Sequence, residues 1–418
     1  MKKLMYLFLA AVVCLLSGCL DDGKVTEKVT VTVNKPVFMP TDVFRSSVHV
    51  KSQPEEITQQ GKICFYEGYL YISEPGKGIH IIDNRNPSSP TPVGFIELIG
   101  NADVAIRNNM LYADSYVDLV WFDISNPALP VLKDRLEDVF IQTLPPIENG
   151  IIDCDIYSDE VRAKGVVVGW TQEEMTYTRE YYKDQILLND AATNSSSGSS
   201  TGVNGSMSRF GLYKDYLYVV LNDQLSIFNL AGAEPEKAAE SIWLSGSVET
   251  IFSYKDCLFM GTPTGMMIYS VADPLKPEYQ SLMWHVYGCD PVVVENDIAY
   301  VTVHAGNNCG QNNNELIILD VSNVKSPQPI VSYTMTKPKG LGIDNGTLFL
   351  CDDGLKVFDA KDPQTLLANR LAHYSGMEGY DVIPHDNVLM MIADDGIYQY
   401  DYSNPKEITM LSKLGVKK

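Results

Sequence analysis

Four carboxylates stand at equivalent places before short apolar runs that have the length and alternation of β-strands. Each precedes or opens the first strand of a different β-rich unit: Asp103, Glu249, Asp290 and Asp381. If those first strands surround a common axis, the carboxylates form an acidic ring at the mouth of a central channel. Such a ring suits calcium or another hard cation, or acid/base chemistry on a bound substrate. Separate solvated acids at loop ends are the alternative interpretation.

A second candidate site is the asparagine-rich segment 304–314. Asparagine tolerates left-handed turns and offers donors and acceptors, so this predicted hairpin loop suits contacts to a sugar or peptide. The predicted contacts are His304, Asn307, Asn308 and Asn312. Cys289 and Cys309 flank the same hairpin, and a loop tied by a disulfide between them is the alternative interpretation. Exposed aromatic residues nearby, such as Trp284 and Tyr287, would favour ligand binding.

Local motifs for catalysis are sparse. The six histidines lack the His-x-x-x-His spacing of a metal site, and neither a phosphate loop nor a Cys-x-x-Cys pair occurs. The formal net charge of −21 repels phosphate backbones, which excludes nucleic acid as a partner. We therefore predict a non-catalytic binding or scaffold module without a cofactor, although the acidic ring suits calcium or another hard cation. A hydrolase or lyase that acts on an extracellular polymer through the channel-mouth carboxylates is the alternative.

A repeat positions all of these residues. From about residue 62 onward, a β-rich run recurs that ends in Asp, Asn or Ser: the terminal residues are Asp83, Asp123, Asn229, Ser270, Asp320, Asp359 and Asp401. Nine prolines stand four or seven positions after these residues. An Asp or Asn side chain binds the backbone of a following turn, and proline ends a strand because it lacks a ladder donor. Each copy therefore contains a strand stopped by the same turn.

Each copy extends to four strands. Two short strands precede the run, as in residues 103–106 and 110–113 around a turn at 108–109, and a fourth follows the proline turn, as in 93–98. Four antiparallel strands per unit predict an all-β fold, a seven-bladed β-propeller. A β-sandwich would not require the same four-strand unit and turn each time.

One interval breaks the spacing. The insertion 138–205 follows the second predicted blade, and a degenerate eighth blade within it is the alternative blade count. Residues 165–170 are strand-like, whereas the Ser/Gly-rich residues 190–206 cannot bury enough apolar surface to become ordered. We expect an extended hairpin with a mobile tip, and a functional loop is the alternative.

The repeated Leu/Ile-x-Val/Ile-x-Asp run followed by Ser-Asn-Pro resembles the LVIVD-repeat family of bacterial surface propellers. The resemblance covers residues from about 62 to 416, and the best matches end at Asp83, Asp123, Asp320 and Asp401. Asn229 and Ser270 lack the acid, which weakens the turn. The resemblance implies an extracytoplasmic β-propeller lipoprotein and implies no reaction.

The N-terminus has a secretory signal pattern. Lys2 and Lys3 precede an apolar run of 13 residues, 4–16, which is shorter than the ~20 that span a membrane. The following Ser17-Gly18-Cys19 completes a sequence that resembles a lipobox. We predict a signal peptide at 1–18, palmitate or similar acyl chains on Cys19, an extended tether at 19–60 and the propeller at 61–418.

Acyl chains on Cys19 would hold the chain on a membrane through about 0.8 kcal/mol per buried CH₂. Leu20-Asp21-Asp22 resembles the acidic patches that direct some Gram-negative lipoproteins to the cell surface, and an ordinary solvated tether is the alternative. We expect a lipoprotein of the outer membrane, facing the periplasm or exposed at the cell surface. The expected partners are the membrane and a protein, peptide or glycan ligand.

Overall fold

The computed structural model describes residues 24–59, 61–140, 143–147, 149–152, 154–155, 158–182, 208–221, 223–238, 240–284, 291–304 and 313–417. The predicted signal peptide, Cys19 and the predicted mobile tip 190–206 lie outside the described residues. The chain divides into a small unit, Met1–Lys35, Ile147–Cys154 and Trp170–Gly198, and a large unit that holds the rest. Across the described ranges, no helix is both long and apolar enough to span a membrane.

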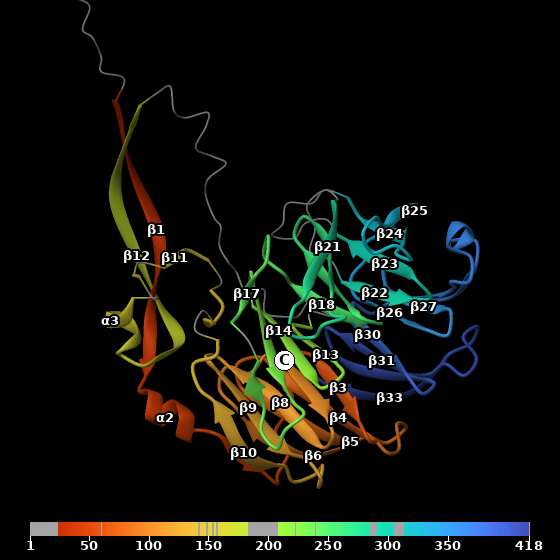
Figure 1. Cartoon of the computed structure of the whole chain (residues 1–418), viewed down its shortest axis with the longest axis horizontal. Helices are drawn as coiled ribbons and strands as arrows, with labels where there is room; N and C mark the ends of the chain where they lie inside the picture. Colours follow the sequence, from red (N-terminus) through yellow and green to blue (C-terminus); the bar gives the residue numbers. More distant parts are fainter. Residues whose placement is uncertain are drawn as a thin grey trace, which may run out of the picture. The chain divides into compact units, whose positions relative to one another are not determined.

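The large unit is all-β, and its described residues form seven sheets in chain order (Figure 1). The first comprises β2 (His49–Lys51), β3 (Ile63–Tyr66), β4 (Tyr69–Glu74), β5 (Gly78–Asp83) and β6 (Thr91–Glu97). The second comprises β7 (Val104–Arg107), β8 (Met110–Ser115), β9 (Asp118–Asp123) and β10 (Val131–Leu136). The third comprises β13 (Phe210–Tyr213), β14 (Tyr216–Leu221), β15 (Gln224–Asn229), β16 (Glu236–Lys237) and β17 (Ile242–Trp243).

The remaining four sheets have four strands each. The fourth comprises β18 (Thr250–Tyr254), β19 (Cys257–Thr262), β20 (Gly265–Ser270) and β21 (Glu278–Trp284). The fifth comprises β22 (Val292–Glu295), β23 (Ile298–Val303), β24 (Glu315–Asp320) and β25 (Gln328–Thr334). The sixth comprises β26 (Leu341–Asp344), β27 (Thr347–Cys351), β28 (Leu355–Asp359) and β29 (Arg370–Tyr374), with the 3₁₀ turn η2 (Pro363–Thr365). The seventh comprises β30 (Gly379–His385), β31 (Val388–Ala393), β32 (Gly396–Asp401) and β33 (Thr409–Gly415).

The predicted antiparallel four-strand unit is confirmed, with two variations. In the third sheet, β16 and β17 both pair with β15 and together take the place of the fourth strand. In the first sheet, β2 adds a fifth strand by pairing antiparallel with β6. The unit thus persists where its outer edge varies.

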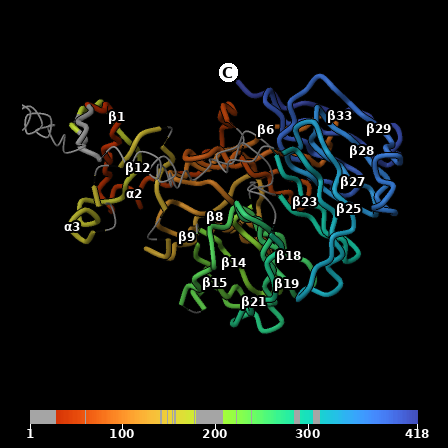
Figure 2. Tube along the Cα trace, turned by 90° about the horizontal axis from the view of Figure 1, so that it is seen from above, coloured from red at the N-terminus to blue at the C-terminus, as the bar shows by residue number. Residues whose placement is uncertain are grey.

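Alternating side chains pack each sheet against both of its neighbours. In β8, Leu111 faces the first sheet, whereas Tyr112 faces the third, because successive residues of a strand point to opposite faces. Six buried apolar clusters join consecutive sheets in this way. A seventh cluster joins the seventh sheet to the first, through residues such as Met390 and Leu70. Figure 2 shows the blue seventh sheet and the orange first sheet meeting near the C-terminus.

The predicted turn after the third strand is confirmed in all seven sheets. The terminal side chain of each β-rich run accepts a hydrogen bond from the backbone N–H two residues later, at 2.8–3.3 Å. Asn229 and Ser270 make this contact as well, so loss of the acid leaves the turn intact. Hydrogen bonds from the following serine lower the pKa of Asp123, Asp320 and Asp401.

The segment expected to be an extended tether contains a helix and a short strand in its C-terminal part. After Pro40, the helix α2 (Thr41–Ser46) buries Phe44 beside Tyr116 of the second sheet. Arg45 donates to both oxygens of Asp118, at 3.0 and 3.2 Å, and Arg135 donates to the same buried carboxylate at 2.9 Å. The side chain of Asp118 is 0% exposed, so this pair of arginines neutralises a buried charge.

The small unit is built on the rest of the expected tether. β1 (Lys24–Met39) lies between β11 (Ile151–Ile152) and β12 (Val166–Tyr182) in a three-stranded sheet. The alternating Thr and Val residues of 29–33 favour a strand. The hydroxyl groups of Thr30 and Thr176 form a hydrogen bond of 2.8 Å between β1 and β12. The long strand of the insertion therefore pairs with the N-terminal segment. Of the insertion's described residues, only β11, the helix α3 (Asp159–Arg162) and β12 have regular structure, and they form no four-stranded blade.

Candidate functional site

Asp103 lies directly before β7, where the sequence places the acidic ring, but its carboxylate is occupied. The side chain is 1% exposed and pairs with Lys62 Nζ of the first sheet at 2.8 Å. Its other oxygen accepts the backbone N–H groups of Arg209 and Phe210 of the third sheet, at 2.6 and 3.2 Å. One carboxylate thus joins three sheets, which makes Asp103 a structural residue.

Cations missed by the sequence analysis occupy the equivalent places in other sheets. Lys62 directly precedes β3 and Arg209 directly precedes β13, just as Asp103 directly precedes β7. The Arg209 guanidinium donates to Asp114 at 2.9 Å. Burial raises the pKa of Asp114, and Arg209 opposes that rise. In the first three sheets the expected acidic ring is therefore a set of ion pairs with alternating sign.

Of the other predicted ring residues, the structure describes Glu249 and Asp381. Glu249 directly precedes β18, and Asp381 lies in β30, where it accepts the N–H of Val382 at 2.9 Å just as Asp103 accepts that of Val104. Asp290 lies outside the described residues. Among the residues with described positions, no group of three His, Cys, Asp or Glu side chains is placed to hold a metal ion. Calcium at this ring stays a prediction.

Most of the predicted loop site lies outside the described residues: Asn307, Asn308, Asn312, Cys289, Cys309 and Tyr287. His304 is described and follows β23; burial lowers its pKa, and Lys339 and Lys337 add to that effect. Trp284, at the end of β21, is 70% exposed. An exposed aromatic residue here is what the sequence analysis expects if the loop binds a ligand. The disulfide stays a prediction.

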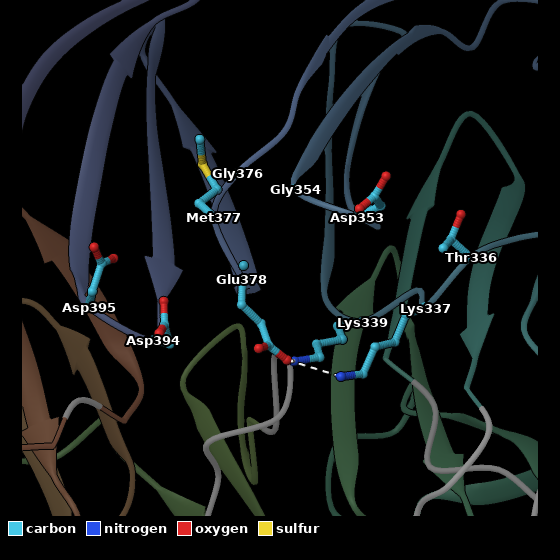
Figure 3. A pocket seen from close by; sticks show the side chains of 11 residues that line it. Thr336, Lys337, Lys339, Asp353, Gly354, Gly376, Met377, Glu378, Asp394 and Asp395 are labelled. Atoms are coloured by element: carbon cyan, nitrogen blue, oxygen red, sulfur yellow. Dashed lines mark hydrogen bonds and ion pairs between the residues drawn. The ribbon is translucent and has the colours of Figure 1, made fainter.

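A pocket of about 530 Å³ opens between the sixth and seventh sheets (Figure 3). Four segments line it: the linkers that join β25 to β26 and β29 to β30, and the turns of the hairpins β27–β28 and β31–β32. Its polar lining residues are Thr336, Lys337, Lys339, Asp353, Glu378, Asp394 and Asp395. Met377 is the one apolar side chain among the lining residues with described positions. This volume lies in the range of pockets that take small ligands.

Two ammonium groups converge on one carboxylate in this pocket. Lys337 Nζ and Lys339 Nζ lie 3.1 and 2.8 Å from the same oxygen, Oε1 of Glu378. The hydrogen bond from Lys339, followed by that from Lys337, lowers the pKa of Glu378 to about 2. Burial lowers the pKa of Lys339, and Glu378 opposes that effect. The site therefore holds a carboxylate that stays ionised at neutral pH.

The hairpin acids that the sequence assigns to turn chemistry have mixed roles. Asp353 and Gly354 adopt φ values of 54° and 97°, the left-handed conformation that their turn requires. Asp352 is buried, accepts the backbone N–H groups of Thr336 and Lys337, and pairs with Lys356 at 2.6 Å. Asp352 thus fixes the linker that carries the two lysines, a positioning role that sequence alone does not reveal.

A family model matches three parts of this chain. The LVIVD repeat model matches residues 60–96, 100–138 and 291–335. The chain carries LVIVD repeats. The matched repeats contain Asp83, Asp123 and Asp320, three of the four copies in which the sequence resemblance is strongest, and Asp401 lies outside the matches. The LVIVD repeats thus correspond to the first, second and fifth sheets.

Curated proteins give no match, whereas solved structures give distant ones. The computationally designed protein Ika8 is 8% identical, with a TM-score of 0.47 and coverage of 87% of this chain and 88% of that chain. Hsv2p of Kluyveromyces lactis is 11% identical, with a TM-score of 0.47 and coverage of 86% of this chain and 100% of that chain. A functionally unknown protein from Desulfotomaculum acetoxidans is 10% identical, with a TM-score of 0.43 and coverage of 50% and 69%.

Proposed function

We propose that this chain is a lipid-anchored protein of the cell envelope, folded as a closed seven-bladed β-propeller, that binds a small polar ligand and catalyses no reaction. The pocket between the sixth and seventh sheets is the observation that carries the binding function. It is polar, it draws on four segments, and a buried carboxylate holds the backbone of the linker that carries its two lysines. Rigid positioning of this kind favours recognition.

Ring closure is supported by contacts between the seventh and first sheets. Asn84 and Gln399 exchange two buried side-chain hydrogen bonds of 2.9 and 2.7 Å. The Ser412 hydroxyl donates to the Pro87 carbonyl at 2.6 Å, and the Lys417 N–H donates to the Ile57 carbonyl at 2.9 Å. Closure would leave no sheet without a neighbour on each face, which explains how the propeller buries its core.

A hydrolase or lyase is less compatible with the occupied carboxylates. A general acid or base needs an oxygen within reach of the substrate. Both oxygens of Asp103 bind protein donors, and those of Asp114 bind Arg209 and backbone N–H groups. These acids therefore stabilise the fold and are poor candidates for proton transfer.

The cellular location rests on the lipobox-like sequence that ends at Cys19 and on the resemblance to surface propellers. Replacement of Cys19 by serine should abolish incorporation of labelled palmitate and release the protein from the membrane fraction. Unchanged labelling would contradict the lipid anchor.

The binding function is tested on the mature chain with a panel of envelope glycans, peptides and small polar metabolites. Each compound is followed by calorimetry for binding and by mass spectrometry for products. We expect binding without products, and we expect it to weaken in a Lys339→Met variant. Turnover of any compound at a rate that depends on pocket residues would refute the non-catalytic assignment.

A further inference from the structure

We infer that the pocket between the sixth and seventh sheets recognises a uronic acid, and that Glu378 occupies the carboxylate position when the sugar is absent. This inference rests on the binding function proposed above and narrows its ligand to a sugar that carries a carboxylate.

The two lysines define a carboxylate position. Lys337 and Lys339 come from one linker and aim both ammonium groups at a single oxygen of Glu378 (Figure 3). Charge-assisted hydrogen bonds of this kind are the strong ones in proteins. A ligand carboxylate at the same point would therefore find both donors already oriented.

Lys339 requires an anion at this position. Its side chain is 7% exposed, and its ammonium lies 4.0 Å from the centre of the Tyr380 ring. A cation that is buried to this extent is unfavourable without a partner charge. The Tyr380 ring contributes a cation–π contact but no net charge. Either Glu378 or a ligand carboxylate therefore has to neutralise Lys339.

Glu378 is placed so that it can leave. Its side chain is 49% exposed, so rotation about its own bonds carries the carboxylate from the lysines into solvent. Glu378 also lies in a short linker between Gly376 and Gly379. Gly376 has a φ of 89°, and no heavy atom outside Gly376 and its two chain neighbours lies within 4 Å of the point where a Cβ would stand. The chain can thus exchange its own carboxylate for that of a ligand at low cost.

The other polar side chains of the pocket favour a sugar over a peptide. Asp353, Asp394 and Asp395 contribute carboxylates, and Thr336 adds a hydroxyl. Asp395 also accepts hydrogen bonds from Tyr398 and Lys413. Sugar hydroxyl groups donate to such oxygens. A peptide C-terminus would also bring apolar side chains, for which the pocket offers only Met377 among the lining side chains that the structure describes. A hydroxyl-rich ligand with one carboxylate matches both the two lysines and these polar side chains.

The test compares D-glucuronate with its methyl ester and with D-glucose, titrated calorimetrically into the mature chain. The ester keeps the shape and hydroxyls but lacks the charge. We expect glucuronate to bind at least about tenfold more tightly than the ester or glucose, because the ester loses the hydrogen bonds to charged donors. High salt should weaken binding of glucuronate and leave that of glucose unchanged.

Variants separate the roles of the charged residues. Glu378→Gln should tighten glucuronate binding by about threefold to tenfold, because the internal competitor is gone. Lys337→Met, at a residue that is 59% exposed, should weaken it about threefold without a risk to folding, and Lys339→Met should weaken it at least tenfold. Lys255→Met removes an exposed lysine that pairs with Asp297 elsewhere, and this control should leave binding unchanged.

Three results would overturn the inference. The first is equal binding of glucuronate and its ester, and the second is an unchanged affinity in Glu378→Gln. The third is selective binding of a tripeptide with a free C-terminus over both its amide and glucuronate, which would assign the pocket to peptides. In that third case, or if a neutral ligand binds in a pocket-dependent manner, the proposed binding function survives while the uronic acid does not.

Discussion

Asp103 offers the sharpest test of whether the charged residues at the sheet starts are structural. The replacement Asp103→Asn keeps the shape of the side chain but removes the charge that pairs with Lys62. It also replaces one acceptor oxygen by an NH₂ group, which is a donor. Depending on which oxygen is replaced, this NH₂ group faces the N–H groups of Arg209 and Phe210 or the N–H group of Val104. The variant therefore loses an ion pair and leaves buried donors without an acceptor.

The size of the effect follows from these contacts. Removal of one partner of a buried ion pair costs about 3–5 kcal/mol. Lys62 is 22% exposed and is partly rehydrated when its partner is lost, so we expect the lower part of that range, about 3–4 kcal/mol. With an unfolding entropy of about 2.1 cal/mol/K per residue over roughly 350 residues, the melting temperature should fall by about 4–6 °C.

Differential scanning calorimetry of the mature chain measures this change. Asp353→Asn is the matched control, because Asp353 is 60% exposed and asparagine accepts its left-handed φ of 54°. The control should shift the free energy of unfolding by less than about 0.5 kcal/mol. Equal melting temperatures for the two variants would refute the structural role of Asp103 and would restore the acidic ring as a candidate binding site.

Gln399→Met should lower the free energy of unfolding, measured in urea, by about 1–3 kcal/mol, because it leaves Asn84 buried without its partner. A second replacement in the same chain, Asn84→Leu, should restore part of this loss. Additive losses for the two replacements would contradict the pairing. The pKa of Glu378 in the folded chain is about 2, chiefly because of the hydrogen bond from Lys339. The contribution of Glu378 to the free energy of unfolding is therefore fully present above its ordinary pKa, and it is lost as the pH falls from about 4.5 to 2. Because Glu378 is half exposed, Glu378→Gln should lower the free energy of unfolding by only about 1 kcal/mol at pH 7 and by nothing at pH 2, and a pH-independent loss would refute the ion pair. Burial raises the pKa of Cys64 to about 11, so peptide mapping after iodoacetamide treatment at pH 8 should find Cys64 unmodified until urea is added; rapid modification of the folded chain would contradict this.

The sequence predicts the turns well because their chemistry is local. Asp123 bonds to a backbone N–H only two residues away, so the pattern of acid and proline contains the whole interaction. The same reasoning holds at Asn229 and Ser270, where a different side chain makes the same bond. The antiparallel four-strand unit follows directly from this repeat, whereas the added strand β2 of the first sheet and the divided outer strand of the third do not.

The charges at the sheet starts are predictable only in part. The sequence reveals that Asp103 precedes a strand, but its partner Arg209 is 106 residues away. A search for acids alone therefore finds a ring of one sign. Inclusion of Lys62 and Arg209, which stand directly before β3 and β13, would have indicated ion pairs between sheets.

The pocket and the small unit depend on packing that the sequence does not encode locally. The linker that carries the lysines of the pocket is held by the buried Asp352, which looks like one more hairpin acid in the sequence. Likewise, β1 has a clear strand pattern, but nothing near it in the chain indicates that its partner is β12, with Thr30 and Thr176 146 positions apart. Long-range pairing of this kind requires the structure.

The ion-pair cluster of α2 has a mechanical consequence. Tension applied at the N-terminus reaches Arg45 and its bonds to Asp118 before it reaches β2, which is hydrogen-bonded along β6. Resistance to stretching is governed by the rate at which such contacts break. Along the chain after β1, the contacts to the buried Asp118 and the pairing of the added strand β2 therefore resist such a pull before β3 and the strands that follow it.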